Sequence, residues 1–223
     1  MDVFCQSVKK YRVLWVFSLF MLALAVLSLE TAQVRTPLVY PESLDMVVAS
    51  VRGEEITLRD FAVYVAHQEA ETDRQARVYN ADNPKQYWKL HTNGQFIKVA
   101  VRDAAAEMAV HDLLFYQLAS ELKLELTEAD LQVLEGKVTD FWTDLTFEGK
   151  ETRLGVSRQD IYNTMYKIAL AEKAQYICAR SDGYKFEDYH FATEEFAEFL
   201  LNYEYEIREN VLKRIDFGNV TLQ

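Results

Sequence analysis

Apolar residues recur at helical spacing in three long segments of the chain. One pattern covers 61–79, a second covers 95–122, and a third follows Ile161, Met165 and Ile168. Apolar side chains at this spacing form a stripe along one face of a helix, and that stripe packs against a neighbouring element. Only three prolines and seven glycines interrupt the whole chain. The pattern therefore predicts a mainly helical domain.

Helix starts are marked by a repeated four-residue signal, which occurs at 57–60, 127–130 and 157–160. In each copy a Thr or Ser hydroxyl can accept a hydrogen bond from the backbone N–H three residues on. The Asp at that third position can reach back to the first backbone N–H. Each copy precedes a new apolar pattern, so we expect helices to begin at these three points.

A short β element precedes the first helix. Residues 46–51 are apolar and β-branched, Arg52 and Gly53 supply a turn, and Ile56 continues in an extended form. We expect the strand at 46–51 to pair with the closing segment near 213–220. The two ends of the domain would then form a small sheet, and the helices would form a cradle.

One uncharged run, 13–29, is long enough to serve as a transmembrane anchor or a signal segment. Its 17 residues span about 25 Å as a helix, near the lower limit for crossing a bilayer. Ala23 and Ala25 match the small-residue pattern of a cleavage site, but they lie inside the apolar run. We expect a retained anchor; a secreted or periplasmic protein after cleavage is the alternative.

The charges beside this run predict its orientation. Lys9, Lys10 and Arg12 precede it, and the positive-inside rule places such a basic start, residues 1–12, in the cytoplasm. The rest of the chain would then lie outside a cell membrane that it crosses once, beginning with a linker at 30–45.

The exported part is acidic, which argues against nucleic acid as a partner. The whole chain carries a net charge of −11, and residues 30–223 hold 21 basic against 34 acidic side chains. The acids are dispersed along helical stretches, as on a solvated helix face. A mild preference for basic polypeptides is the alternative interpretation of this charge.

The two cysteines are not expected to form a disulfide within the chain. Cys5 precedes the apolar run and would lie in the cytoplasm, whereas Cys178 stands alone outside. We interpret Cys178 as a small buried hydrophobic residue. Stability must then come from packing, and half of the chain, 50%, is apolar.

No residue pattern indicates catalysis, a metal site or a cofactor. His67 and Glu71 lie four residues apart on a predicted helix, but zinc requires a further ligand on the same face, and the second histidine is missing. His111 and Asp112 are adjacent within a helix, where neighbours point in different directions, so we do not expect them to form a dyad. The chain is therefore not expected to be an enzyme.

The order of these segments resembles the N-terminal, client-binding domain of the SurA and PrsA family of extracytoplasmic foldases. VVASVRGEEITLRDF at 47–61 is similar to that domain's strand, glycine turn and first helix, with Arg52 in place of the usual asparagine. LASELKLELTEADL at 118–131 and LGVSRQDIYNTMYKIALAEKA at 154–174 resemble its following helices. The resemblance covers 46–178 and implies a bacterial, extracytoplasmic protein that binds unfolded polypeptides.

The parvulin isomerase module of such foldases has no counterpart in the chain. FAEFLLNYEYEIRENVLKRIDFGNVTL at 196–222 is similar to the closing helix and short strand that follow this module in relatives of this kind. Only a short loop, 180–194, occupies the place of the module. Parvulin activity relies on histidines with a nearby cysteine or aspartate, and of these we find His190 and Asp188 in the loop. The resemblance therefore implies a chaperone-like domain at 46–223 without isomerase activity.

Aromatic residues make up 13% of the chain, and a few of them could line an apolar groove for client segments. Core packing is the alternative for any single one. The candidates for client binding are Tyr64, Trp88, Phe96, Tyr116, Phe141 and Trp142.

Two functions agree with these observations. The first is an extracytoplasmic, membrane-anchored chaperone-like protein that binds unfolded or exported polypeptides without chemical turnover. The alternative is a dedicated structural or interaction protein that uses the same fold to bind one specific exported or membrane partner. Neither function needs a cofactor.

Overall fold

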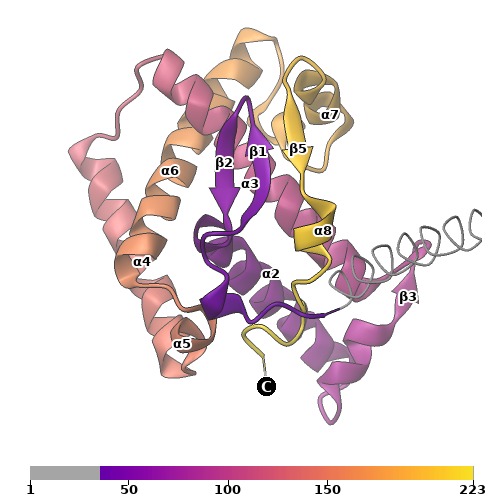
Figure 1. The fold of residues 1–223 in the computed structure, drawn as a ribbon. Helices are drawn as coiled ribbons and strands as arrows, with labels where there is room; N and C mark the ends of the chain where they lie inside the picture. Colours follow the sequence, from indigo (N-terminus) through magenta and orange to yellow (C-terminus); the bar gives the residue numbers. More distant parts are fainter. Residues whose placement is uncertain (1–35, 223) are drawn as a thin grey trace, which may run out of the picture. The chain divides into compact units, whose positions relative to one another are not determined.

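A small antiparallel sheet joins segments from the two ends of the described chain. In the computed structural model, which describes residues 36–222, strand β1 (Val47–Val51) lies between β2 (Glu54–Thr57) and β5 (Tyr205–Ile207), as Figure 1 shows. Ala49 is paired with Ile56 on one side and with Ile207 on the other. Helices make up most of the remaining structure. The expected mainly helical fold with a small sheet is therefore confirmed.

The strand that closes this sheet lies earlier in the chain than expected. Residues 205–207 pair with β1, whereas 213–220 follow the short helix α8 (Glu209–Leu212) as turns and bends. Gly218 has a φ of +87° within that segment, a left-handed conformation that interrupts extended backbone. The prediction that 213–220 forms the pairing strand was therefore wrong in position.

The β1–β2 hairpin turns through Arg52 and Gly53. Both have positive φ angles, +50° and +83°, as a two-residue type I′ turn requires. Asn and Gly are favoured in such a turn because they tolerate the left-handed region. Arg52 adopts it while its guanidinium forms an ion pair with Glu121 at 2.7 Å and lies over the Tyr203 ring.

Three long helices begin at the predicted signals. These are α2 (Leu58–Tyr79), α4 (Glu128–Phe147) and α6 (Arg158–Ser181), and each has a complete capping box at its start. The fourth long helix, α3 (Ile97–Glu121), begins two residues after the expected start because β4 (Gln95–Phe96) pairs with β3 (His91–Thr92).

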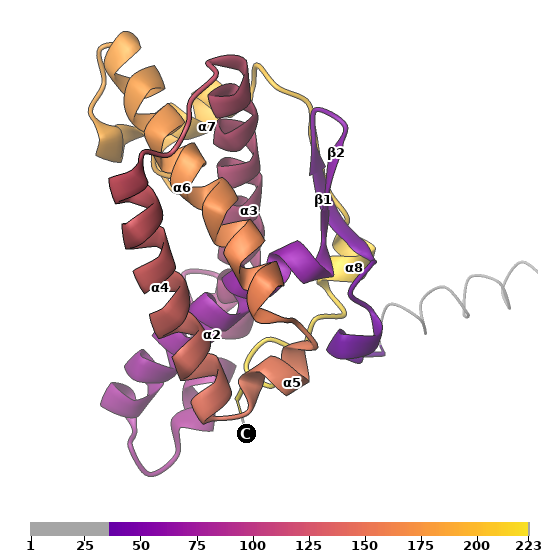
Figure 2. The same cartoon turned by 90° about the vertical axis from the view of Figure 1, so that its left-hand side faces the viewer.

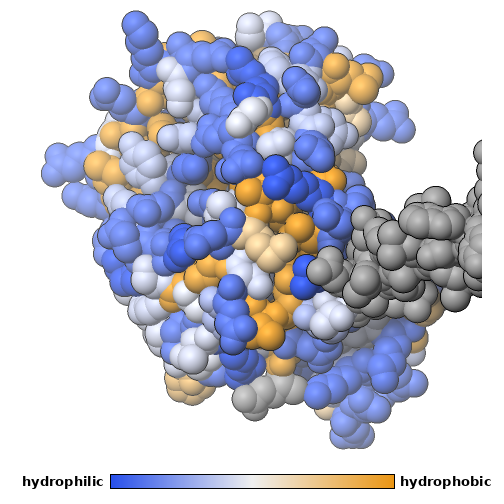
Figure 3. All heavy atoms as spheres, in the orientation of Figure 1, coloured by the Kyte–Doolittle hydropathy of each residue, from blue (hydrophilic) through white to orange (hydrophobic). Residues whose placement is uncertain are grey.

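Helix α6 lies between α3 and α4, as Figures 1 and 2 show from two directions. Both α3 and α6 carry small buried residues, which permit close helix packing: Ala105 and Ala109 on α3, and Ala171 and Ala174 on α6. Helix α4 packs against α6 and the short helix α5 (Lys150–Leu154) at the edge of the bundle. Figure 3 shows that the face seen in Figure 1 is mostly hydrophilic, with hydrophobic residues gathered near its middle.

Shorter elements complete the described chain. Three 3₁₀ turns, η1 (Tyr40–Glu42), η2 (Pro84–Lys89) and η3 (Phe186–Tyr189), lie in the connections, and α7 (Glu194–Leu200) precedes β5. None of the helices within 36–222 combines the length and hydropathy that a bilayer crossing requires. The predicted anchor or signal segment at 13–29 lies outside the described residues.

A buried carboxylate fastens the C-terminal segment to α2. Glu69 is fully buried, and its two oxygens accept hydrogen bonds from the backbone N–H groups of Gly218, Val220 and Thr221 and from the Thr221 hydroxyl, at 2.5–3.1 Å. Burial raises the pKa of Glu69, while these hydrogen bonds act in the opposite direction. Beside this contact Trp88 packs on Gly218, where an added Cβ would lie 2.8 Å from the indole ring.

Gly155 provides a test of how the start of the domain is held. We expect Gly155→Ala to destabilise the fold by about 2–4 kcal/mol, because the φ of +71° is strained for alanine and the new Cβ would lie 2.7 Å from the Pro41 Cα. Gly149 has a similar φ of +64° but open space around it, so Gly149→Ala should cost only about 1 kcal/mol. Urea unfolding of both variants measures the difference. Equal costs would contradict a packed contact between η1 and α5.

Candidate functional site

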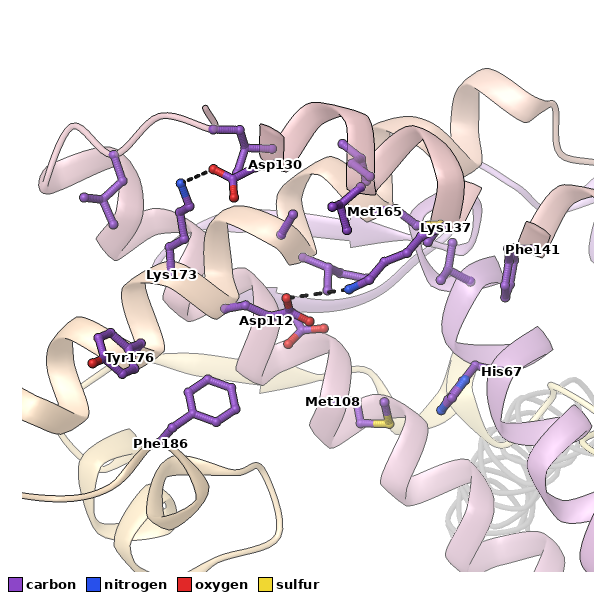
Figure 4. A pocket seen from close by; sticks show the side chains of 18 of the residues that line it. His67, Met108, Asp112, Asp130, Lys137, Phe141, Met165, Lys173, Tyr176 and Phe186 are labelled. Carbon is purple, nitrogen blue, oxygen red and sulfur yellow. Dashed lines mark hydrogen bonds and ion pairs between the residues drawn. The ribbon is translucent and has the colours of Figure 1, made fainter. Parts of the chain in front are cut away.

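An apolar groove opens among four helices and is shown from close by in Figure 4. Its volume is about 900 Å³, near the upper end of the range for ligand pockets. The groove is lined by Val63 of α2, Met108 of α3, Val133 of α4, Ile168 of α6 and Phe186 of η3. The groove therefore draws its surface from segments that are far apart in the sequence.

Several of these apolar side chains remain open to solvent. Val133 is 61% exposed, Ile177 is 40% exposed and Phe186 is 39% exposed. They lie on three elements, α4, α6 and η3, that face the same hollow. Exposed apolar side chains gathered around one concave surface indicate a binding site more strongly than the same residues scattered singly.

Ion pairs fix α4, one wall of the groove, to α6. Lys137 of α4 lies 3.9 Å from Glu172 of α6, and Asp130 at the start of α4 accepts a hydrogen bond from Lys173, as the dashed lines in Figure 4 mark. Arg158 at the start of α6 pairs with Glu135 of α4. These pairs hold two antiparallel helices along the groove, although exposed pairs contribute little stability individually.

Asp130 should titrate at unusually low pH. Hydrogen bonds from Lys173 and then from Thr127 lower its pKa from 3.8 to about 2. Because the folded pKa lies below the unfolded value, the ionised carboxylate stabilises the fold above pH 3.8, and this contribution is lost as the pH falls toward about 2. We expect Lys173→Met to raise this pKa and Lys137→Met to leave it unchanged, measured by carboxyl-carbon NMR. A wild-type pKa near 3.8 would contradict the contact.

A hydrogen-bonded chain runs from the groove to η3. Tyr64 donates to Asp112 Oδ2 at 3.0 Å, His111 Nδ1 lies 2.8 Å from Asp112 Oδ1, and His111 Nε2 lies 3.0 Å from the Tyr189 carbonyl oxygen. Since the carbonyl can only accept, His111 Nε2 donates this hydrogen bond. The chain of contacts therefore links α2, α3 and η3.

The contact between His111 and Asp112 corrects the expectation that these neighbours do not interact. Asp112 bonds with Tyr64 of α2 through Oδ2, and its other oxygen, Oδ1, lies 2.8 Å from His111 Nδ1. His111 is buried against Phe115 and Phe196, which it approaches edge-on. The pair therefore orders the interior next to the groove.

The structure places two of the six predicted client-binding aromatics in the groove, Tyr64 and Phe141. Trp88 is buried against Gly218, and Phe96 is 52% exposed on the β3–β4 hairpin, where it packs edge-on against His91. Tyr116 and Trp142 are half-buried against the core and do not line the groove.

No protein-family model, no curated protein and no solved structure matches this chain. The groove must therefore be interpreted from its own residues.

Most of the apolar residues that line the groove are aliphatic or methionine, so the aromatic content of the sequence does not reveal them. Val63, Met108, Val133, Ile168 and Ile177 contribute to its surface from four different helices. In the sequence each belongs to an ordinary apolar stripe, so no local signal separates it from core residues. A usable signal is the excess of apolar positions on α4, whose stripe includes the exposed Leu131 and Val133.

Other candidate chemistry is sparse within residues 36–222. No group of three or more His, Cys, Asp or Glu side chains in this part is arranged to hold a metal ion. His67 borders the groove, and Asp188 accepts a hydrogen bond from the Lys185 backbone N–H at 2.9 Å. Cys178 is a half-buried free thiol, and burial raises its pKa. The groove is thus the strongest candidate site.

Proposed function

We propose that this protein is an extracytoplasmic, chaperone-like protein that binds unfolded or exported polypeptides without isomerase activity. The single observation that carries the proposal is the groove of about 900 Å³ with exposed apolar side chains on facing walls. Burial of apolar surface contributes roughly 25 cal/mol per Å² and needs no particular sequence in the partner. A groove of this kind suits many clients.

The charge and hydrogen bonding of the groove support binding over catalysis. Two of its lysines are engaged, Lys137 with Glu172 and Lys173 with Asp130. Asp112 is engaged by Tyr64 and His111. Groups already paired in this way favour a passive surface, on which a client is held by apolar contact and then released.

The segment that replaces a parvulin module in the resemblance is short and folded back on the helical domain. Between α6 and α7 it forms η3, whose Phe186 carbonyl accepts a hydrogen bond from Gln175 at 3.0 Å and whose Tyr189 is buried. It contributes Phe186 to the groove in place of a catalytic domain. This arrangement supports a domain of the SurA and PrsA type that binds without isomerising.

We place the helical domain outside the cell membrane, tethered by residues 13–29. The apolar run and the basic residues Lys9, Lys10 and Arg12 support this topology. A tethered domain would meet clients as they emerge from the membrane.

Aggregation of unrelated unfolded clients tests the proposal. The full chain, held in phosphatidylcholine nanodiscs, should lower the light scattering of several clients in proportion to its concentration, with empty nanodiscs as the control. Failure with all of these clients would contradict a general chaperone-like activity. If a pull-down also returned one stoichiometric partner, the dedicated interaction protein would be the correct alternative.

A further inference from the structure

We infer that the groove binds an amphipathic helix with a basic residue beside one end of its apolar stripe. The inference rests on the proposed function and narrows it to one class of client segment. Two properties of the groove carry it: its helical walls bond their backbone groups internally and so offer few partners to an extended chain, and one of its carboxylates has no ion-pair partner within the described residues.

Backbone hydrogen bonding in the groove walls favours a helical occupant. The walls are α2, α3, α4 and α6, whose internal N–H and C=O groups are bonded within each helix. Where loops reach the groove, the Glu125 carbonyl accepts from Lys173 at 3.1 Å and the Phe186 carbonyl accepts from Gln175 at 3.0 Å. An extended segment would bury unpaired backbone groups, whereas a helix carries its own hydrogen bonds.

The dimensions of the groove agree with a short helix. Its lining residues extend along α4 from Asp130 to Phe141 and along α6 from Met165 to Ile177. At 1.5 Å per residue these stretches are about 16 and 18 Å long, or roughly three helical turns. An occupant of about three turns could present one apolar stripe to Val133 and Ile177 on the two walls.

The charged side chains make one end of the groove different from the other. The charged lining residues comprise four acids and two lysines. Lys137 and Lys173 offset Glu172 and Asp130, and Asp112 is engaged by Tyr64 and His111. Among the lining residues that the structure describes, Glu125 is then the acid whose side chain has no ion-pair partner. It lies in the α3–α4 connection, beside Leu124 and Leu126.

A basic residue at the matching end of a client helix would pair with Glu125. Lys or Arg near a helix C-terminus is also favoured by the helix dipole, so the same residue would stabilise the client helix and its binding. Since the pair is exposed, we expect it to increase the affinity for the client about 2- to 5-fold at low salt and to have little effect at high salt.

Peptide binding to the full chain in phosphatidylcholine nanodiscs tests the inference by fluorescence anisotropy. The probes share one apolar helical stripe of about three turns and end in two lysines, two glutamines or two glutamates. A fourth probe carries the lysines and a central proline. We expect the lysine probe to bind most tightly, the glutamate probe least tightly, and the proline probe about tenfold more weakly than its parent, because proline breaks the helix.

Two matched variants assign the charge preference. Glu125→Gln should reduce the difference in affinity between the lysine and glutamine probes by about 2- to 5-fold, leaving only the contribution of the helix dipole. Glu128→Gln, which changes an exposed acid three residues further along and outside the groove, should keep the full difference. Equal binding of the three helical probes to the wild type, or an undiminished difference in Glu125→Gln, would overturn the charge preference and leave the proposed function standing. Undiminished binding of the proline probe would overturn the helical occupant.

Further results distinguish a client helix from other occupants of the groove. If none of the probes binds but the chain still suppresses client aggregation, this inference is wrong and the proposed function stands; if suppression also fails, both are wrong. A photo-crosslinker at position 177 should react with the probe. If it reacts instead with a second copy of the chain, or with residues 1–35 of its own chain, the inference of a bound client helix is wrong.

Discussion

Glu69→Ala should destabilise the fold by about 3–5 kcal/mol, since it leaves three backbone N–H groups and the Thr221 hydroxyl without their acceptor. Glu69→Gln should lower the stability less, because its amide oxygen can still accept hydrogen bonds. Some loss remains, since its amide nitrogen would face backbone donors. Urea unfolding of the full chain, monitored by tryptophan fluorescence, measures both changes in stability. Trp88 is a local reporter because it packs on Gly218.

The control for this variant is Glu71→Ala, two residues further along α2. The Glu71 side chain is 45% exposed and pairs with Arg74, so its removal should leave the unfolding midpoint nearly unchanged. Hydrogen exchange adds a positional test: in Glu69→Ala the amides of 218–221 should exchange faster, and those of β1 should lose protection less. Similar midpoints for Glu69→Ala and Glu71→Ala would show that the C-terminal segment is not held by this carboxylate.

Charges placed on opposite walls of the groove should abolish client binding while the domain stays folded. In the double variant Val133→Asp, Ile177→Asp, each new carboxylate would be buried by a bound apolar segment, and that burial is costly. We expect suppression of aggregation to require at least about tenfold more protein. Val133 and Ile177 are 61% and 40% exposed, so the expected loss of stability is small, about 1 kcal/mol.

Val78→Asp, Leu201→Asp is the matched control. These residues are 90% and 84% exposed and do not line the groove, and the double variant adds the same two charges. It should suppress aggregation as the wild type does. If both double variants lose activity equally, net charge rather than the groove would account for the loss.

The starts of the helices could be predicted because capping is a local interaction. Thr57, Thr127 and Ser157 each bond with an Asp three residues later, and all three capping boxes form in the structure. The β1–β2 hairpin could be predicted for the same reason, since its turn needs residues in the left-handed conformation and Gly53 is one of them. Its partner β5 was placed too late, because a three-residue strand leaves almost no pattern in the sequence.

Most of the residues that line the groove could not be predicted, because the lining depends on how four helices pack. Val63 and Ile168 belong to ordinary apolar stripes, and only their approach in space makes them neighbours of Phe186. Aromatic content was a poor guide for the same reason: Trp88 fills a gap above Gly218, whereas Phe141 lines the groove. The contact of His111 with Asp112 depends on side-chain conformations that residue spacing does not reveal.

Site-specific photo-crosslinking tests the central claim, that the groove is the surface that binds clients. A photoreactive amino acid replaces Val133 inside the groove or Val78 outside it, two exposed valines on different helices. With an unfolded client added to the full chain, we predict crosslinks from position 133 and essentially none from position 78. Equal crosslinking from the two positions, or crosslinking from position 78 alone, would contradict the account.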